Sequence, residues 1–346
     1  MLYLLTGCAG FIGSCTTEQL LTAGHTVYGL DNRNDAYDPV LKEWRLQQLA
    51  RHARFHFCPL DITDRSALSA WVFSALQNEG KTSTDGNSKE ISEKNGFDAC
   101  IHLAARAGVR YSVENPWIYL DTNVTGTLNI LELCRETNTK KLVMASSSSV
   151  YGNTQEEIFR ENQPTDTPCS PYAASKKAGE ALAYSYHHLY GLDVSALRFF
   201  TVYGPAGRPD MSILRFVHAI AEGIPLRLYG NGEQERDFTY CDDIAAGVIS
   251  ALRPVGYEIF NLGGDHTYSI RELIEIIARQ LEKSPIIECF PAHPADVDRT
   301  CADISKARQF LDWEPCWTLE NGIAQTISWY LANRDWVREL RTLRAE

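Results

Sequence analysis

The sequence predicts an α/β fold built around a doubly wound parallel sheet, with a smaller mixed α/β domain toward the C-terminus. Two observations predict the sheet. Short apolar runs alternate with helical patterns over the first 200 residues, and a glycine-rich turn at residues 7–13 joins the first run to a helix. Such alternation is typical of βαβ units, whose parallel strands are covered by helices on both faces. Beyond residue 200 the strands become short and irregular, which indicates the second domain.

Seven apolar runs bounded by polar or glycine residues are the expected strands. They lie near 2–6, 26–31, 54–58, 98–103, 141–146, 193–198 and 257–261. Helices should begin near Phe11, Pro39, Asp64, Pro116 and Pro171, and later ones should occupy about 242–252, 268–281 and 319–344. Pro171 after Ser170 is typical of a helix start, and Ser269 with Glu272 forms a capping-box pattern.

The chain is expected to form two interleaved domains. Residues 1–200, joined by about 236–262, should form the sheet domain, while 201–235 and 263–346 should form the second domain. Ligands of open α/β sheets bind beyond the carboxyl ends of the strands, so the second domain should cover a site there. Residues 77–96 are polar and glycine-containing, which predicts a flexible surface insertion.

Composition and charge exclude several classes of partner. The 346 residues include 33 Lys and Arg against 44 Asp and Glu, a formal net charge of −11, which argues against nucleic acid or an anionic membrane. No stretch approaches the roughly 18 apolar residues of a membrane span, and the first strand begins at Leu2, so we expect a cytoplasmic protein. The ten cysteines show no Cys-x-x-Cys pair and no metal-ligand spacing, which predicts reduced thiols and no metal site.

Tyr172 and Lys176 are the most informative pair of residues. They stand four positions apart just after the expected helix start, so both side chains project from one face of that helix. A free tyrosine has a pKa of about 10, and a neighbouring cation favours its phenolate form. The spacing therefore predicts a general base for the oxidation of a secondary alcohol. The alternative is an ordinary surface pair on an amphipathic helix.

The glycine-rich turn predicts a dinucleotide beside this base. Gly7, Gly10 and Gly13 follow a buried strand and open a helix, an arrangement that brings a pyrophosphate to the helix N-terminus. The next strand ends in Asp31, whose carboxylate can bind the ribose 2′-hydroxyl and would repel a 2′-phosphate, so the sequence favours NAD over NADP. The Gly-x-x-Gly-x-x-Gly spacing differs from the usual fingerprint, and a generic strand-to-helix turn is the alternative.

Two further strand ends carry side chains suited to a sugar. Residues 146–149 are four consecutive serines, whose hydroxyls could bond sugar alcohols, although a turn-forming serine cluster would show the same pattern. Small residues at 104, 105, 107 and 108 allow a cofactor to approach closely. Arg110 follows them and could reach a phosphate or carboxylate, or face solvent.

Together these motifs resemble the extended short-chain dehydrogenase/reductases. The resemblance rests on the glycine turn, Leu103-Ala104-Ala105, Asn123-Val124-x-Gly126-Thr127, the serine run with Val150-Tyr151-Gly152, and the Tyr172 and Lys176 pair. Three later segments, 198–205, 236–239 and 296–297, are similar to the branch that modifies nucleotide sugars. Within that branch, residues 37–42, 107–112 and 207–211 are similar to UDP-glucuronate 4-epimerases. Arg106, in place of an expected Gln, and Ala295, in place of an expected Gly, depart from the pattern.

The resemblance implies an isomerase that interconverts UDP-glucuronate and UDP-galacturonate by transient oxidation at C4, with a permanently bound NAD. The sheet domain is then a Rossmann domain that binds NAD, and the second domain binds the nucleotide sugar. Helices near 116–137 and 171–190, with apolar positions such as Leu128, Leu131 and Leu182, would form a homodimer interface.

The resemblance also assigns roles to individual residues. Tyr172, Lys176 and Ser147 would be catalytic. The cofactor-binding residues would be Gly7, Gly10, Phe11, Ile12, Gly13, Asp31, Asn32, Asp61, Ile62, Leu103, Ala104, Ala105, Asn123, Tyr172, Lys176 and Phe199. The substrate-binding residues would be Arg110, Ser147, Ser148, Ser149, Thr201, Arg208, Arg236, Asp296 and Arg299. Arg236 and Arg299 are candidates for a phosphate clamp, and Arg208 for the uronate carboxylate, because a guanidinium fork suits both anions.

Three other functions stay open from the sequence. A UDP-glucose 4-epimerase would use the same base and cofactor but would not need Arg208 for a carboxylate. A UDP-glucuronate decarboxylase would carry a Glu where Ser149 stands. A sensor or scaffold that binds a dinucleotide without catalysis would not need Ser147, Tyr172 and Lys176.

Overall fold

The computed structural model describes residues 1–80, 96–154, 156–291 and 298–344. Residues 81–95, which make up most of the predicted insertion, lie outside the described residues, as do Ala295 and Asp296. Within the described ranges, no helix combines the length and the apolar character that crossing a bilayer would require.

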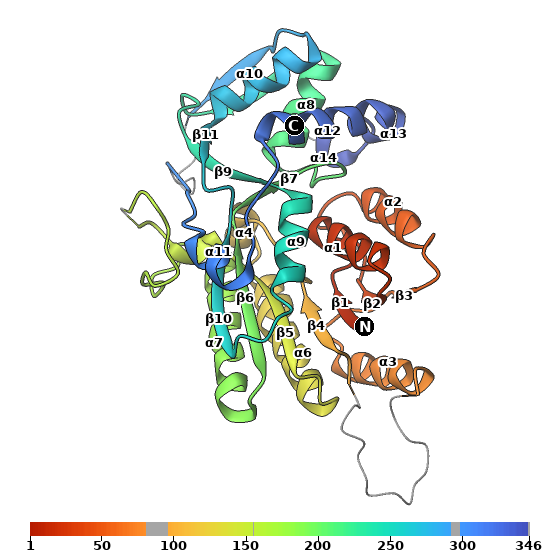
Figure 1. The fold of residues 1–346 in the computed structure, drawn as a ribbon. Helices are drawn as coiled ribbons and strands as arrows, with labels where there is room; N and C mark the ends of the chain where they lie inside the picture. Colours follow the sequence, from red (N-terminus) through yellow and green to blue (C-terminus); the bar gives the residue numbers. More distant parts are fainter. Residues whose placement is uncertain (81–95, 155, 292–297, 345–346) are drawn as a thin grey trace, which may run out of the picture.

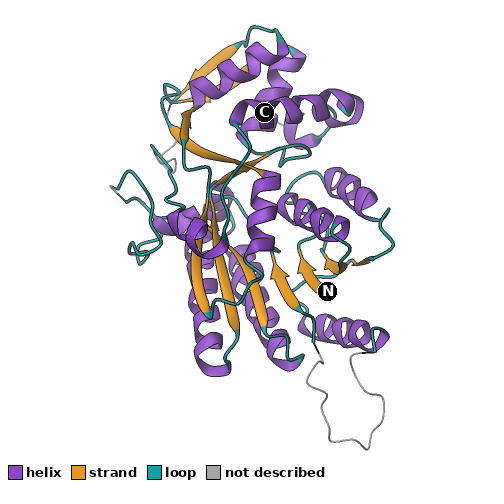
Figure 2. Cartoon of the chain, in the orientation of Figure 1, coloured by secondary structure: helices purple, strands orange, loops and turns teal. Residues whose placement is uncertain are grey.

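A seven-stranded, fully parallel sheet forms the lower part of the molecule (Figures 1 and 2). Its strands are β1 (Leu2–Thr6), β2 (Thr26–Leu30), β3 (Phe55–Cys58), β4 (Ala99–His102), β5 (Lys141–Ser147), β6 (Asp193–Phe199) and β10 (Tyr257–Leu262). They follow one another in the order β10-β6-β5-β4-β1-β2-β3. All seven strands predicted from apolar runs are present, because parallel strands buried on both faces are apolar along their whole length.

Helices cover both faces of this sheet and bury one core on each. On one face, α1 (Phe11–Thr22), α2 (Pro39–Leu49) and α9 (Cys241–Ser250) pack against side chains such as Leu5 and Val143. On the other face, α3 (Arg65–Asn78), α6 (Gly126–Glu136) and α7 (Pro171–Tyr190) pack against side chains such as Leu4 and Leu142. Each fully buried Leu or Val stabilises the fold by about 1.5–3 kcal/mol relative to exposure. The predicted doubly wound class is confirmed.

A smaller α/β lobe lies above the carboxyl ends of the strands (Figure 1). It holds two small sheets, ordered β11-β9-β7 and β12-β8. The strands are β7 (Thr201–Tyr203), β8 (Leu226–Tyr229), β9 (Glu235–Tyr240), β11 (Thr267–Ser269) and β12 (Ile287–Phe290). With α8 (Ser212–Glu222), α10 (Ile270–Leu281) and α12 (Leu319–Ala332) they enclose a third core. The division of the chain into domains at the boundaries given above stays a prediction.

Several helix starts follow the predicted capping chemistry. The Ser170 hydroxyl accepts from the N–H of Ala173 at 3.1 Å at the start of α7. Ser269 and Glu272 form the predicted capping box of α10. These side chains satisfy N–H groups that the first turn of a helix leaves without partners.

The structure differs from the predicted helices in three regions. The helix predicted at 319–344 is divided into α12, α13 (Arg334–Val337) and α14 (Arg341–Arg344), with the first break at Asn333, where φ is −116°. The helix predicted from Pro116 is α5 (Pro116–Tyr119), a π-helical segment η1 (Leu120–Thr125), and then α6. Helices α4 (Val109–Glu114), α8 and α11 (Ser305–Leu311) were not predicted, because their surroundings lack strong cap or strand signals.

A buried ion pair joins α7 to the sheet. Arg198 on β6 donates Nε and Nη2 to the two carboxylate oxygens of Glu180 on α7, each at 2.9 Å, and both side chains are almost fully buried. Glu180 also accepts from the Ser146 hydroxyl at 2.7 Å. Removing one member of such a pair leaves the other charge buried and uncompensated.

We expect Glu180→Gln to lower the free energy of unfolding by about 3–5 kcal/mol, because the Arg198 guanidinium would remain buried without its counter-ion. Urea denaturation monitored by tryptophan fluorescence measures the change. Asp265→Asn is the matched control, since it breaks the half-exposed pair between Asp265 and Arg308 and should cost at most about 1 kcal/mol. Equal losses in the two variants would contradict the structural role given to Glu180.

Candidate active site

The glycine turn forms one wall of the site at the carboxyl end of β1. Gly7 has φ +78°, and its N–H donates to Leu30 O at 2.7 Å, while the N–H of Gly10 donates to Gly7 O at 2.9 Å. A Cβ on Gly13 would overlap the Gly7 carbonyl oxygen, and one on Gly7 would overlap the backbone of Ala104. The turn therefore requires glycine at both positions. It presents the N-terminal N–H groups of α1, with their partial positive charge, to the space above the sheet.

Asp31 lies at the end of β2 beside this turn, and it is buried. Its Oδ1 accepts from the N–H of Arg33 at 2.7 Å, and the ammonium of Lys42 lies 3.9 Å from the same oxygen. Burial lowers the pKa of Lys42 to about 8, and the Asp31 charge opposes that shift. Sequence reasoning missed Lys42 as a site residue, although it lies in one of the segments that carry the family resemblance.

Asn32 follows Asp31 at the end of β2, and Asp61 lies beyond the end of the neighbouring strand β3. The Asn32 amide donates to Asp61 Oδ2 at 2.6 Å, and hydrogen bonds from Asn32 and Thr63 lower the pKa of Asp61 despite its partial burial. Ile62 is buried beside them and contacts Gly126 so closely that a Cβ there would overlap it. The structure therefore brings Asn32, Asp61 and Ile62, which were assigned to the cofactor, together with Asp31.

Tyr172 and Lys176 project from the first turns of α7 toward the end of β5. Tyr172 lies beside Ser147, whose side chain lowers the pKa of the phenol, and Lys176 Nζ donates to Ala145 O at 2.9 Å. Ser147 Oγ also accepts from the Ser149 N–H at 3.2 Å, which fixes the serine at the strand end. The three residues assigned to catalysis are thus in one place.

Burial shifts the pKa values of this pair in opposite directions. It raises the pKa of Tyr172, and the Ser147 hydrogen bond and the Arg208 charge lower it. Burial lowers the pKa of Lys176 to about 8, and the Glu180 charge opposes this shift. Below pH 8 Lys176 therefore carries its proton, held by Ala145 O and by the field of Glu180.

His102 lies behind Lys176 and was not predicted as a site residue. Its Nδ1 and Nε2 are hydrogen-bonded to the hydroxyls of Thr6 at 2.7 Å and Thr127 at 3.0 Å. Burial and the Lys176 charge lower the pKa of His102 to about 3, so the ring is neutral at physiological pH. The neutral ring therefore links the Thr6 and Thr127 hydroxyls by hydrogen bonds and places no second positive charge beside Lys176.

Asn123 connects the π-helical segment to the site. Its side chain accepts from Arg106 N at 2.8 Å, donates to Arg106 O at 2.9 Å, and donates to Ser175 Oγ at 2.9 Å. A π-helical turn changes the direction of the side chains that follow it, which is a common use of such turns at functional sites. The Arg106 side chain lies on the cofactor side, 3.9 Å from Asp35, and its charge contributes to the lowered pKa values of Asp61 and Lys42.

The other predicted cofactor residues line the strand ends. The N–H of Leu103 donates to the Thr6 carbonyl at 3.1 Å, and the N–H of Ala104 donates to the Thr6 hydroxyl at 3.1 Å. Phe199 is the last residue of β6. Phe11 and Ile12 open α1, and Ala105 follows Ala104 beyond β4.

Arg208 lies across the site from Tyr172, on the loop after β7. It makes a bidentate ion pair with Asp210, with Nε to Oδ1 at 3.0 Å and Nη2 to Oδ2 at 2.5 Å, and stacks over the Tyr37 ring at 5.9 Å. Thr201 and Arg208 line one pocket. Sequence reasoning did not foresee Asp210 as the partner of Arg208.

A fully buried arginine, Arg45, joins this loop to the glycine turn. Its guanidinium donates to Ala206 O at 2.6 Å and to Ala9 O at 2.9 Å, and to the Tyr37 hydroxyl at 2.5 Å. Nothing in the local sequence distinguished Arg45 from a surface arginine of α2, so its role becomes visible only in three dimensions.

The remaining predicted arginines divide into two groups. Arg236 and Arg299 meet at Glu235: Arg236 donates to its carbonyl at 2.8 Å, and Arg299 pairs with its carboxylate at 3.0 Å. Arg110 lies elsewhere, with its guanidinium 4.9 Å from the centre of the Tyr229 ring. Ser148 follows Ser147 in a short 3₁₀ turn with Ser149.

Arg110 belongs to a basic cluster that sequence reasoning missed. Burial lowers the pKa of Arg215 on α8, the charges of Arg110 and Arg227 lower it further, and Asp210 opposes them. Because Asp210 also pairs with Arg208, the cluster continues directly from the site of Tyr172. Its signal in the sequence was weak, since the three arginines come from separate elements.

Comparison with known proteins assigns the chain to a family. The sequence model of the NAD dependent epimerase/dehydratase family matches residues 3–263. The chain belongs to this family. A UDP-glucuronate 4-epimerase of Thermodesulfobacterium geofontis is 50% identical over 340 residues, which cover 98% of this chain and 99% of that protein.

Solved structures of family members superpose closely. The UDP-glucuronic acid 4-epimerase from Bacillus cereus, in complex with UDP-glucuronic acid and NAD, has a TM-score of 0.84 and 33% identity, covering 96% of this chain and 100% of that one. A UDP-glucose 4-epimerase from Thermotoga maritima, with UDP-glucose, has a TM-score of 0.81 and 27% identity, with coverage of 96% and 100%.

We expect Gly13→Ala to abolish dinucleotide retention, because the added methyl group would push the Gly7 carbonyl out of the turn. The measurement is the ratio of nucleotide to protein after denaturation of the purified chain. Ser14→Ala, one residue further along α1, removes only a hydroxyl bonded to Phe11 O within the helix and should retain the wild-type ratio. A Gly13→Ala protein with full nucleotide content would mean that the turn does not hold the dinucleotide.

Proposed function

We propose that this protein is a UDP-glucuronate 4-epimerase, which interconverts UDP-glucuronate and UDP-galacturonate with tightly bound NAD. The observation that carries the proposal is the convergence of Ser147, Tyr172 and Arg208 beside the glycine turn. The relationship to the enzymes from Thermodesulfobacterium geofontis and Bacillus cereus supports the same substrate.

The residues present fit NAD. The glycine turn leaves a cradle that a Cβ would fill, at the positive end of α1, where a pyrophosphate is favoured. Asp31 offers a buried carboxylate at the end of β2 for the ribose hydroxyls, and Asn32 and Asp61 adjoin it. Arg106 adds positive charge on the same side.

The chain's own residues move the proton of the sugar C4 hydroxyl. Tyr172 accepts it as the phenolate, Ser147 bonds the same oxygen, and Lys176 stabilises the phenolate by its charge. Bound NAD would supply the hydride-transfer chemistry, in which the hydride removed from C4 is returned to the other face. Because the hydride is returned, no net redox change occurs.

The UDP group must anchor the substrate while the keto-sugar rotates to present its other face. Arg236 and Arg299 are candidates for one part of the UDP group, and the cluster of Arg110, Arg215 and Arg227 provides a second basic surface. Guanidinium groups bind phosphate oxygens through directed pairs of hydrogen bonds. Asp296, assigned to the substrate by resemblance, lies outside the described residues.

The uronate carboxylate imposes a further requirement. Oxidation at C4 produces a β-keto acid, which loses carbon dioxide when the carboxylate stands perpendicular to the carbonyl plane. Asp210 fixes two nitrogens of Arg208, so the substrate carboxylate would meet the remaining Nη1 and the hydroxyls of Thr201, Ser148 and Ser149.

The pairing of Arg208 with Asp210 also favours one second candidate. If Asp210 satisfies Arg208 completely, a neutral sugar fits the site better than a uronate, and UDP-glucose 4-epimerase becomes the alternative. The similarity to the UDP-glucose 4-epimerase from Thermotoga maritima is consistent with this alternative.

Product analysis distinguishes the two functions. We expect the purified protein to convert UDP-glucuronate to UDP-galacturonate without added cofactor, and to act at least tenfold more slowly on UDP-glucose. Tyr172→Phe should remain folded and retain NAD, with turnover reduced by about 10²-fold or more through loss of the base. Faster turnover of UDP-glucose would assign the alternative, and a fully active Tyr172→Phe would remove the base from Tyr172.

Replacement of Arg208 tests the carboxylate contact. Arg208→Ala should reduce turnover of UDP-glucuronate severely and leave NAD content unchanged, since loss of one partner of a buried charge pair costs about 2–5 kcal/mol. Arg208→Lys restores the charge without the planar fork and should recover only part of the activity. The ratio of UDP-pentose to UDP-galacturonate should rise in both variants. Unchanged activity and ratio in Arg208→Ala would exclude this contact.

The predicted homodimer is supported by exposed apolar side chains on the expected helices. Tyr184 and Leu189 on α7 are 54% and 64% exposed, and Leu120 on η1 and Leu128 on α6 are also exposed. Leu131, in contrast, is fully buried in the core of its own chain, and Leu182 is partly buried against it. A surface of this kind would be covered by a second copy.

Light scattering at micromolar concentration should therefore give the mass of a dimer. Leu128→Glu should shift the protein toward the monomer, because it places a charge in the covered face. Leu331→Glu, at a more exposed leucine on α12 in the other lobe, is the control and should leave the mass unchanged. A monomeric wild-type protein would refute the dimer.

A further inference from the structure

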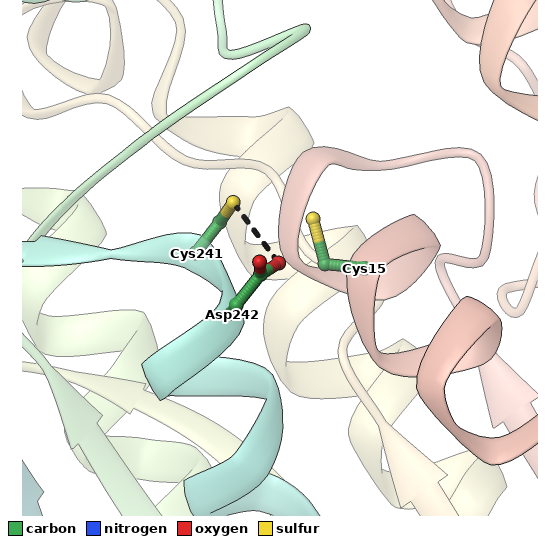
Figure 3. Close-up of side chains that lie close together, drawn as sticks. All are labelled: Cys15, Cys241 and Asp242. Atoms are coloured by element: carbon green, nitrogen blue, oxygen red, sulfur yellow. Dashed lines mark hydrogen bonds between the residues drawn. The ribbon is translucent and has the colours of Figure 1, made fainter. Parts of the chain in front are cut away.

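A second polar cluster lies away from the site described above, between α1 and α9 (Figure 3). Cys15 belongs to α1, while Cys241 and Asp242 are the first two residues of α9. The two helices pack along one another, and the Gln19 side chain on α1 donates to Asp242 O at 3.0 Å. The two sulfur atoms and a carboxylate oxygen lie within 4.8 Å of one another.

The spacing of these atoms is close to that of a tetrahedral metal site. Zinc lies about 2.3 Å from thiolate sulfur and about 2.0–2.2 Å from carboxylate oxygen, so tetrahedral ligands are separated by roughly 3.6 Å for S···O and 3.8 Å for S···S. Cys241 Sγ is 3.7 Å from Asp242 Oδ1. Shifts of about 1 Å or less in the Cys15 side chain would complete three ligands, within its freedom to rotate.

The electrostatic surroundings of the cluster are acidic. Burial and the Asp243 charge raise the pKa of Asp242. Burial raises the pKa of Tyr240 above its ordinary value, and so do Cys241, Asp242, Cys15 and Asp243. The charge of Asp243 therefore lies beside the cluster and favours a cation there.

Asp243 is not a fourth ligand, because its carboxylate is already engaged. Its oxygens accept from the N–H groups of Cys316 and Trp317, each at 3.1 Å. Cys15 and Asp242 are partly exposed while Cys241 is buried, so an ion could enter from solvent and keep water as its fourth ligand.

A disulfide between Cys15 and Cys241 explains less of this arrangement. A disulfide would give no role to the carboxylate of Asp242, although its Oδ1 lies 3.7 Å from Cys241 Sγ. A metal ion uses all three groups.

We propose that Cys15, Cys241 and Asp242 form a binding site for one thiophilic divalent cation, of which Zn²⁺ is the type. The wide separation of these residues in the sequence hid the site from any spacing rule. Binding would couple the helix that starts at the glycine turn to the segment after β9. Cys241 also packs against Gly204, where a side chain would collide with its sulfur, and Gly204 precedes the loop that carries Arg208.

Cobalt(II) is the probe for the test, since thiolate ligands give it a charge-transfer absorption and tetrahedral sites give it strong visible bands. The full-length protein is reduced, freed of metal with a chelator, and titrated with CoCl₂. We expect thiolate absorption that saturates at one equivalent per chain and is displaced by Zn²⁺. Zn²⁺ should also raise the melting temperature of the wild type, because it binds the folded state.

Matched variants assign the ligands. Cys15→Ser and Asp242→Asn should weaken cobalt binding by at least tenfold and abolish the Zn²⁺-dependent rise in melting temperature. Cys169→Ser, at an exposed cysteine whose thiol bonds Thr167 O, should behave like the wild type. The proposal is overturned if the folded wild type gives no thiolate absorption, or if Cys15→Ser gives the same titration. A Cys15–Cys241 disulfide in protein purified without reductant would also overturn it, if the reduced protein then binds no cobalt.

Discussion

The site depends on one buried guanidinium that binds backbone carbonyls. Arg45 reaches Ala9 in the glycine turn and Ala206 in the loop that carries Arg208, so one side chain fixes the distance between the two walls of the site. Its charge is stabilised by carbonyl dipoles, by the Tyr37 hydroxyl and by the rings of Phe11 and Tyr37. A charge buried in this way is costly to move, which makes the separation of the two walls well defined.

Burial opposes the charged form of Lys176, the residue next to the proposed base, and the charge of Glu180 partly restores that form. Lys176 loses its proton near pH 8 in the folded chain but only near its ordinary pKa of 10.5 when unfolded. The protonated form is therefore a cost to stability at neutral pH, and this cost disappears as pH rises from 8 to about 10.5. The fold carries that cost because Glu180, itself paired with Arg198, keeps a negative charge close to the ammonium. A positively charged nicotinamide would similarly favour the phenolate of Tyr172.

The sequence was sufficient where a local rule determines the structure. Apolar runs located all seven strands of the sheet, and Ser170 and Ser269 marked their helices, because strand burial and capping depend on near neighbours. The family resemblance predicted that Tyr172 and the glycine turn belong to one site. The roles of Arg45, His102 and Arg215 could not be predicted, since each depends on partners from distant elements.

The π-helical segment shows the same limit on a smaller scale. A proline start and apolar spacing predict a helix from Pro116, but they do not predict where an extra residue widens a turn. Asn123 lies in this widened turn, and its side chain makes two hydrogen bonds to the backbone of Arg106. Asp210 is a similar case, because a carboxylate two residues from Arg208 could equally have faced solvent.

The path of the chain through the large sheet has a consequence for its synthesis on the ribosome. Strand β6 ends at Phe199, but its outer neighbour β10 begins only at Tyr257, after the chain has built most of β7 to α9. At translation rates of about 5–20 residues per second, the edge of β6 waits roughly 3–12 s for its partner. During that interval its unpaired N–H and C=O groups form an open edge that another nascent chain can join. A shielding chaperone, or slow pairing with the wrong strand, would therefore act at this edge before the enzyme is complete.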